Sequence, residues 1–260
     1  MKKRVLVTCS AKGGVPYYWF SAYDQTLRMQ HAEYEFEFMM ESGNAAIGIS
    51  RNIAAQNAME HGYWKLVQID KDQFWNPAQL IGLVSRPEAI VAAPYVKKKS
   101  GPVKWLIVKT PGAEVQEDGL LQCDFVGTGM LSTEIAALQH MVDFYPERRF
   151  LYEDEDGSTK TMTELFPIGL VGPNTPEGRL ARIASAGTFR EVQDILHCNL
   201  ETPGRMLGED YGFCLLARKA GLKIWCDTRQ VVGHVGDVVY PITTEALNTP
   251  ASIPTHNLDL

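Results

Sequence analysis

Two aspartates follow an apolar run in the segment KLVQIDKDQFW. The run LVQI has the composition of a buried strand, and Asp70 and Asp72 come directly after it. Asn76 and Pro77 then predict a helix start, as an N-cap followed by proline at the first helical position. Because open α/β sheets bind ligands at the carboxyl ends of their strands, the pair predicts a site for a divalent cation and the phosphates that it neutralises. Alone, an Asp-x-Asp pair is more often a turn.

A second acidic pair, Glu209 and Asp210, lies far along the chain. These residues open a predicted helix that carries apolar residues throughout and closes at Gly221. A short predicted strand after it places His234 between two glycines. Taken singly, the acidic pair favours a helix N-terminal charge and the histidine favours a structural role.

The segment SRNIAAQNAMEHG predicts another helix, with Ser50 as its N-cap and Gly62 as its closing residue. This assignment places Arg51 and Asn52 in the first turn. An arginine beside free backbone N–H groups is well placed to bind an anion. The alternative is a solvated or salt-bridged arginine.

Strand-like and helix-like stretches alternate along the chain, which predicts an α/β fold. A loop with Gly13 and Gly14 follows the first strand, and a plain turn and a ligand-binding loop are equally open there. Ser132 or Thr133 is expected to cap the helix that follows the strand around Gly127 and Gly129. The expected strands are 5–9, 34–40, 66–69, 89–95, 104–109, 121–131, 222–226 and 230–236, and the expected helices are 16–30, 50–62, 77–85, 132–142 and 208–221.

The composition fits a soluble globular protein, with 45% hydrophobic and 22% charged residues among 260. A formal net charge of −6 argues against a protein that coats nucleic acid, although a local basic groove stays open. The run Lys97 to Lys99 is expected to be solvated surface. Five cysteines without a Cys-x-x-Cys pair predict neither a disulfide framework nor a zinc site, which favours a reducing compartment. No apolar run approaches the roughly 18 residues of a membrane span, so a cytoplasmic protein without a membrane anchor is expected.

The periodic pattern predicts one domain over residues 1–240. It loosens within 144–205, which we expect to be a variable segment on the acceptor side. Residues 241–260 have little periodicity and contain Pro250 and Pro254, so we expect a tail.

Four features occur in a fixed order: a small-residue loop after the first strand, an Arg-Asn helix start, a strand ending in Asp-x-Asp, and a late Glu-Asp helix followed by a strand with histidine. In this order the chain resembles the GT-A glycosyltransferases, particularly the inverting family-2-like group and its stand-alone viral and phage members. The resemblance covers most of residues 4–238 and implies a mixed, mostly parallel central sheet flanked by helices. The matching segments are VLVTCSA, SRNIAAQNAMEHG, VQIDKD, CDFVGTGMLS, GEDYGFCLLARKAGLKIWCD and VVGHVG.

The resemblance implies a metal site and a general base. Asp70 and Asp72 would be the metal motif, with Asp72 as the more direct ligand, and His234 would complete the metal shell with Mn²⁺ or Mg²⁺. Asp210, in the pair with Glu209, would be the general base. Breaking a sugar–phosphate bond leaves a nucleoside diphosphate whose charge a metal ion stabilises, and a carboxylate can accept the proton of an acceptor hydroxyl.

The resemblance also implies a nucleotide-sugar donor. Arg51 would approach the nucleotide base or the diphosphate. Residues bordering the base and ribose would be Thr8, Ser10 and Ala11, and the floor beneath the donor sugar would be Gly127 and Gly129. Lys71 departs from the small or acidic residue that is usual between the two aspartates. Inversion is expected, while retention stays open because the sequence does not give the geometry of the acceptor face.

Several alternatives stay open. A sugar-phosphate nucleotidyltransferase also needs a metal, but the first loop lacks the expected glycine- and arginine-rich signature. A non-catalytic glycan-binding protein on the same fold is the other alternative. The hydroxyl acceptor could be a soluble glycan, a protein or a hydroxymethylated base of viral DNA, for which Lys97 to Lys99, Lys104 and Lys109 could form a basic patch. A viral protein of this kind would act in the host cytoplasm, and the sequence leaves its oligomeric state open.

Overall fold

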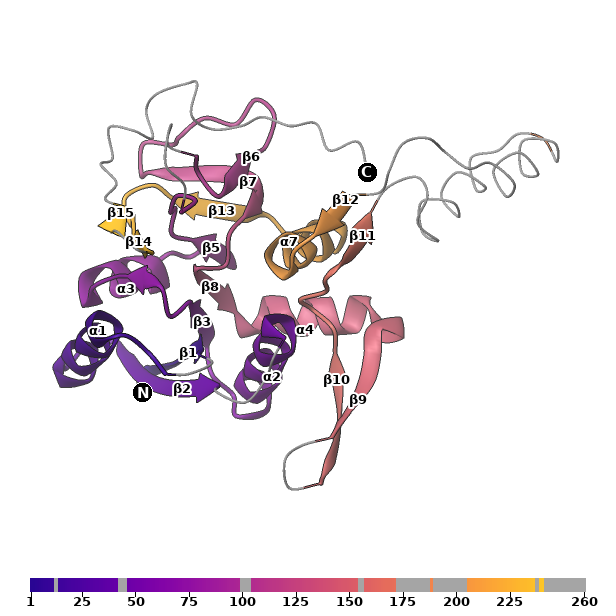
Figure 1. Cartoon of the computed structure of the whole chain (residues 1–260), viewed down its shortest axis with the longest axis horizontal. Helices are drawn as coiled ribbons and strands as arrows, with labels where there is room; N and C mark the ends of the chain where they lie inside the picture. The colour runs from indigo at the N-terminus through magenta and orange to yellow at the C-terminus, as the bar shows by residue number, and fades with distance from the viewer. Residues whose placement is uncertain are drawn as a thin grey trace.

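An eight-stranded sheet forms the centre of the protein, in the order β2-β1-β3-β8-β5-β13-β7-β6 (Figure 1). The structure is a computed structural model that describes residues 1–11, 14–41, 46–98, 104–153, 157–171, 188, 205–236 and 239–240. Gly13, most of the expected variable segment and the 241–260 tail lie outside these residues. The predicted fold class, a mixed α/β fold with a mostly parallel sheet flanked by helices, is confirmed.

Six of the eight central strands run in one direction, because β1 is parallel to β2 and β3, β5 is parallel to β13, and β7 and β8 alone run the other way. The carboxyl ends of β1, β3 and β5 therefore meet at one edge of the sheet. The strand bounds are β1 Lys3–Ser10, β2 Tyr34–Glu41, β3 Lys65–Ile69, β5 Ile90–Ala92, β6 Ile107–Lys109, β7 Leu120–Val126, β8 Met130–Glu134 and β13 Ile224–Asp227.

Smaller sheets surround the central one. A three-stranded sheet in the order β15-β14-β4 joins Val239–Tyr240, Gly233–Val235 and Gln73–Phe74. The antiparallel ribbon of β9 (Arg149–Glu153) and β10 (Thr159–Thr163) extends away from the central sheet (Figure 1). The short strands β11 (Gly169–Val171) and β12 (Arg205–Leu207) form a further antiparallel pair.

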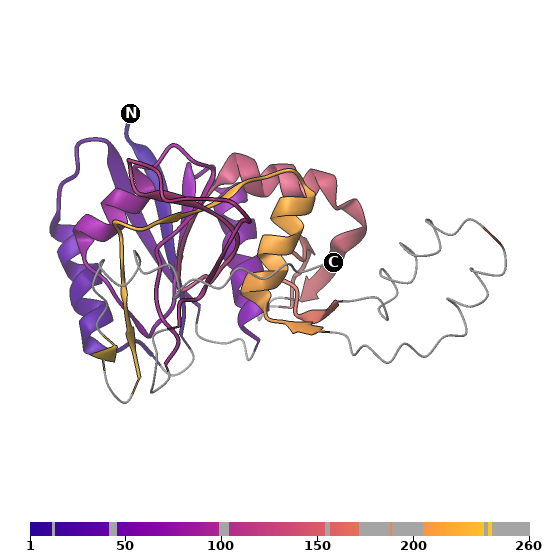
Figure 2. The same ribbon diagram turned by 90° about the horizontal axis from the view of Figure 1, so that it is seen from above.

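Helices cover both faces of the central sheet (Figure 2). On one face, α1 (Tyr17–Arg28) and α3 (Pro77–Val84) pack on Val5, Val7 and Val67. On the other, α2 (Ile47–Glu60), α4 (Ile135–Phe144) and α7 (Glu209–Lys219) pack on Leu6, Leu66 and their neighbours. Successive strand residues point to opposite faces, so each buried strand serves two cores. None of the described helices is long and apolar enough to cross a bilayer.

Two predicted helix starts are wrong, and the predicted cap of a third helix is confirmed. Helix α2 begins at Ile47, so Ser50 is not its N-cap. Small buried residues, including Gly48, let this helix pack closely on its neighbours, and tertiary contacts extend it by one turn. Ser132 and Thr133 lie within β8, and Glu134 is the N-cap of α4. The predicted cap of α3 is confirmed, since Asn76 and Gln79 form a reciprocal capping box.

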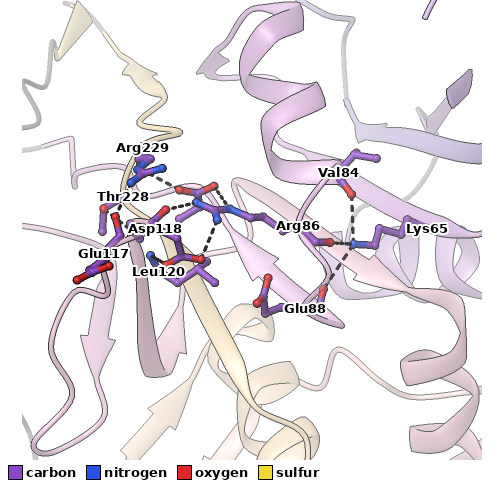
Figure 3. A network of polar contacts seen from close by, with 11 residues as sticks. Lys65, Val84, Arg86, Glu88, Glu117, Asp118, Leu120, Thr228 and Arg229 are labelled. Atoms are coloured by element: carbon purple, nitrogen blue, oxygen red, sulfur yellow. Dashed lines mark hydrogen bonds and ion pairs between the residues drawn. The ribbon is translucent and has the colours of Figure 1, made fainter. Parts of the chain in front are cut away.

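A polar network secures the amino end of β3 (Figure 3). The side chain of Lys65 is fully buried, and its Nζ donates to the carbonyl oxygens of Val84, Arg86 and Glu88 at 3.3, 2.5 and 3.4 Å. The Arg86 side chain reaches on to Asp118, at 3.0 Å between Nη1 and Oδ2. These bonds tie the turn after α3 to the strands on both sides of it.

Candidate active site

The turn after β3 lies at the carboxyl edge of the sheet. The Asp70 N–H donates to the carbonyl of Gly129 at 2.9 Å, and the Gln73 N–H donates back to the carbonyl of Asp70 at 3.0 Å. The Tyr18 hydroxyl on α1 donates to the carbonyl of Lys71 at 3.3 Å. Backbone contacts on both sides therefore fix the turn that presents Asp70 and Asp72.

Asp70 is paired with a buried arginine. Arg51 has 2% of its surface exposed, and its Nη2 lies 2.7 Å from Oδ1 of Asp70. Its Nε lies 3.7 Å from Oε1 of Glu209. Burial raises the pKa of Asp70 above its ordinary value, although the charge of Arg51 opposes this effect. Arg51 thus links the tip of β3 to the first residue of α7.

The predicted position of Arg51 in a first helical turn is wrong, because Arg51 is preceded by four residues of α2. Its own backbone is inside the helix, where free N–H groups are not available for an anion. The contacts of its side chain with Asp70 and Glu209 match the salt-bridged alternative. A contact with a nucleotide stays a prediction.

Asp72 has two nitrogen partners on one oxygen. Its Oδ2 forms an ion pair with Nζ of Lys98, and it lies 3.5 Å from Nε2 of His234. Burial works against the charge of Asp72, but the hydrogen bonds from His234 and Lys98 outweigh burial and lower its pKa to about 2. Asp72 is therefore ionised at any pH near neutrality.

His234 is oriented by the backbone. Its Nδ1 lies 2.6 Å from the carbonyl oxygen of Val96, which can only accept, so Nδ1 carries the proton. Nε2, which faces Asp72, donates to its carboxylate when it carries a proton and offers a lone pair to a metal ion when it does not. An imidazole held in this way by a backbone carbonyl is a typical metal ligand. Tyr95 packs edge-on against the ring with 5.1 Å between centroids, which fixes its orientation further.

The donor set fits part of a metal site. Asp72 and His234 supply an anionic oxygen and a lone-pair nitrogen, which suit Mn²⁺. Asp70, by contrast, is committed to Arg51. Within the described part of the chain, no three acidic, histidine or cysteine side chains gather closely enough to hold a metal ion by themselves. A metal at Asp72 would therefore need further ligands from a substrate or water.

The second acidic pair lies at the start of α7. Burial raises the pKa of Asp210 to about 6, and the charge of Glu209 adds to the effect. The Asp210 Oδ1 accepts from the N–H of Tyr211 at 2.7 Å. The two acidic pairs lie near each other, because Arg51 contacts both Asp70 and Glu209. A carboxylate with a pKa near neutrality has the property that a general base requires.

The remaining predicted residues lie along the same edge. Thr8, Ser10 and Ala11 lie at the carboxyl end of β1, beside β3. Gly127 and Gly129 flank the turn between β7 and β8, where a Cβ on either residue would overlap the ring of Tyr95. These glycines are thus required by the packing of Tyr95, and their contact with a donor sugar stays a prediction.

Three neighbours of the site were missed in the sequence. Tyr95 is buried under the glycine turn, and its hydroxyl accepts from the N–H of Gly129 at 3.1 Å. Lys98 was expected to be solvated, but it contacts Asp72. Gln73 is fully buried, and neither polar atom of its side chain has a hydrogen-bond partner among the described residues. The sequence around Tyr95, with a proline before it and lysines after it, does not predict these contacts. They form between elements that are distant in sequence.

Comparisons with known proteins give weak likenesses. The sequence matches no protein-family model, and no curated protein matches it. Similar solved structures include A197 from STIV, with a TM-score of 0.37 and 14% identity over 66% of this chain and 100% of that one. Mannose-1-phosphate geranyltransferase from Thermus thermophilus has a TM-score of 0.38 and 9% identity over 57% of this chain and 61% of that one. A glycosyltransferase involved in the glycosylation of the major capsid of PBCV-1 has a TM-score of 0.32 and 12% identity over 56% of this chain and 67% of that one.

Proposed function

We propose that this protein is a metal-dependent glycosyltransferase that moves a sugar from a nucleotide-sugar donor to a hydroxyl acceptor. The observation that carries the proposal is the meeting of two acidic pairs at one sheet edge, although some 140 residues separate them in the chain. Arg51 contacts one member of each pair, Asp70 and Glu209. Two acidic groups with different partners match a reaction that must stabilise a departing diphosphate and remove a proton.

The charge of the site supports the binding of a metal ion. Among the ion pairs of the described residues, two cationic side chains, Arg51 and Lys98, contact the acidic groups of the site, and the carboxylates outnumber these two. The carboxylates are Asp70, Asp72, Glu209 and Asp210. Asp72 and His234 would hold a Mn²⁺ or Mg²⁺ ion, which would supply Lewis-acid stabilisation of the leaving diphosphate.

Asp210 would act as the general base of an inverting transfer. Its pKa of about 6 leaves it mostly ionised at pH 7 and still basic enough to accept a proton from a hydroxyl. Arg51 would keep Asp70 and Glu209 in place around it. The donor would lie along Thr8, Ser10 and Ala11 at the end of β1.

The decisive experiment incubates the full chain with single nucleotide sugars and Mn²⁺ and identifies the released product. Free nucleoside diphosphate supports glycosyl transfer, whereas pyrophosphate formed from a sugar phosphate and a nucleoside triphosphate supports the nucleotidyltransferase alternative. Release should require Asp72, so Asp72→Ala should abolish it. Asp24→Ala is the matched control, because Asp24 pairs with Arg28 on the exposed surface of α1. Full turnover by Asp72→Ala would overturn the proposal.

A further inference from the structure

Lys98 lies where a metal ion would contact Asp72. The ammonium group and Nε2 of His234 meet the same carboxylate oxygen, Oδ2. A divalent cation bound between Asp72 and His234 would therefore lie next to this ammonium group. Two positive charges a few ångströms apart repel each other strongly in a partly buried site.

The backbone around Lys98 is anchored, so the contact does not depend on the lysine side chain alone. The Lys97 N–H donates to the carbonyl of Lys104 at 2.9 Å, and Val96 forms a bridge with Trp105. The carbonyl of Val96 accepts from His234, the second partner of Asp72. The same short segment thus orients the imidazole and delivers the ammonium group.

The side chain of Lys98 keeps the freedom to leave. About a third of it is exposed, as is about a third of Asp72. An ion pair at this exposure contributes little free energy, so a divalent cation can displace the lysine. The long stem of lysine allows the ammonium group to move by several ångströms without a change in the backbone.

We propose that Lys98 is a built-in competitor of the metal: its ammonium group neutralises Asp72 in the metal-free protein and is displaced when a divalent cation binds. This inference rests on the proposed function, because it assumes a metal at Asp72. Once displaced, the ammonium group would be available to the diphosphate of a donor. Lys98 would thus lower the affinity of the site for the metal ion without being a ligand of it.

The test measures binding of Mn²⁺ alone to the full chain, by the electron paramagnetic resonance signal of free Mn²⁺ at constant ionic strength. Lys98→Ala should bind Mn²⁺ roughly three- to tenfold more tightly than the unaltered protein, because a competing charge is removed. Lys98→Arg keeps the charge and should bind with the unaltered affinity. Lys97→Ala removes an equal charge one residue earlier and should change the affinity by less than about twofold.

Three outcomes would overturn the inference. Equal or weaker Mn²⁺ binding by Lys98→Ala means that Lys98 does not compete, and Asp72-dependent turnover would then leave the proposed function standing. A gain that persists in the Asp72→Asn, Lys98→Ala double variant means that the ion binds elsewhere. If neither the unaltered protein nor Lys98→Ala binds millimolar Mn²⁺, both the inference and the metal dependence of the proposed function fall.

Discussion

The two ends of β3 use buried charge in opposite ways. At the amino end, Lys65 donates to three backbone carbonyls, which accounts for all three of its N–H groups. At the carboxyl end, Asp72 contacts the partly exposed side chain of Lys98, which can exchange partners, and the side chain of Gln73 has no hydrogen-bond partner among the described residues. A saturated group holds a fold together, whereas a group with spare bonding capacity is available to a ligand. We therefore expect substitutions at the carboxyl end of β3 to lower activity and substitutions at the amino end to lower stability.

The largest expected effect is at the carboxyl end. Asp72→Asn should lower kcat/KM by roughly 10³-fold, because it removes the anionic oxygen that would contact the metal. Its free energy of unfolding should change by less than about 1 kcal/mol, since the ion pair with Lys98 is partly exposed. Steady-state kinetics and urea unfolding measure the two quantities. If Asp72→Asn lost as much stability as a variant of a core residue, the two ends of β3 would not differ as we expect.

Asp210→Asn should lower kcat by about 10²- to 10³-fold, because the amide cannot accept the proton of the acceptor. The same change should stabilise the fold at pH 8. Burial raises the pKa of Asp210 to about 6, so its ionised form costs folding free energy above that pH. The amide removes this cost, for a gain of about 1–3 kcal/mol. Thermal unfolding at pH 8 checks the sign, and a destabilised variant would contradict this account of the pKa.

Lys65→Ala tests the other end of β3. It should destabilise the protein by about 3 kcal/mol, because three carbonyl oxygens lose their donor in a buried site. The remaining folded protein should keep its kcat/KM within about twofold, a factor that corresponds to a negligible change in transition-state free energy. Lys3→Ala is a control on the exposed surface near the same edge. An inactive but stable Lys65→Ala protein would break the comparison.

The pH dependence gives the smallest expected effect. Below pH 6, Asp210 becomes protonated and kcat/KM should fall by about tenfold per pH unit, with a plateau above pH 7. Asp72 does not contribute to this limb, because its pKa of about 2 keeps it ionised over the whole range. A profile measured from pH 5 to 9 would contradict the assignment if activity stayed constant through pH 6.

Much of the fold was predictable from local patterns. The apolar runs of β1 and β3, the capping box of α3 and the acidic start of α7 each depend on neighbouring residues. The start of α2 was not predictable, since Gly48 packs on the carbonyl of Phe166, which lies more than a hundred residues away in sequence. The sequence did not predict that a turn divides the expected strand 121–131 into β7 and β8. The glycines of this turn pack on Tyr95, which follows a different strand.

The sequence by itself determined which acidic groups end a strand or open a helix, because strand composition and helix capping are local properties. It therefore placed Asp70, Asp72 and Asp210 at element ends. Only the tertiary structure decided their partners: Arg51 for Asp70, and His234 and Lys98 for Asp72. These partners lie on other elements, and the pairing of strands and the packing of helices bring them within bonding distance. The charge state of these aspartates and their capacity to bind a further partner depend on that distance and on burial. A local sequence pattern predicts neither.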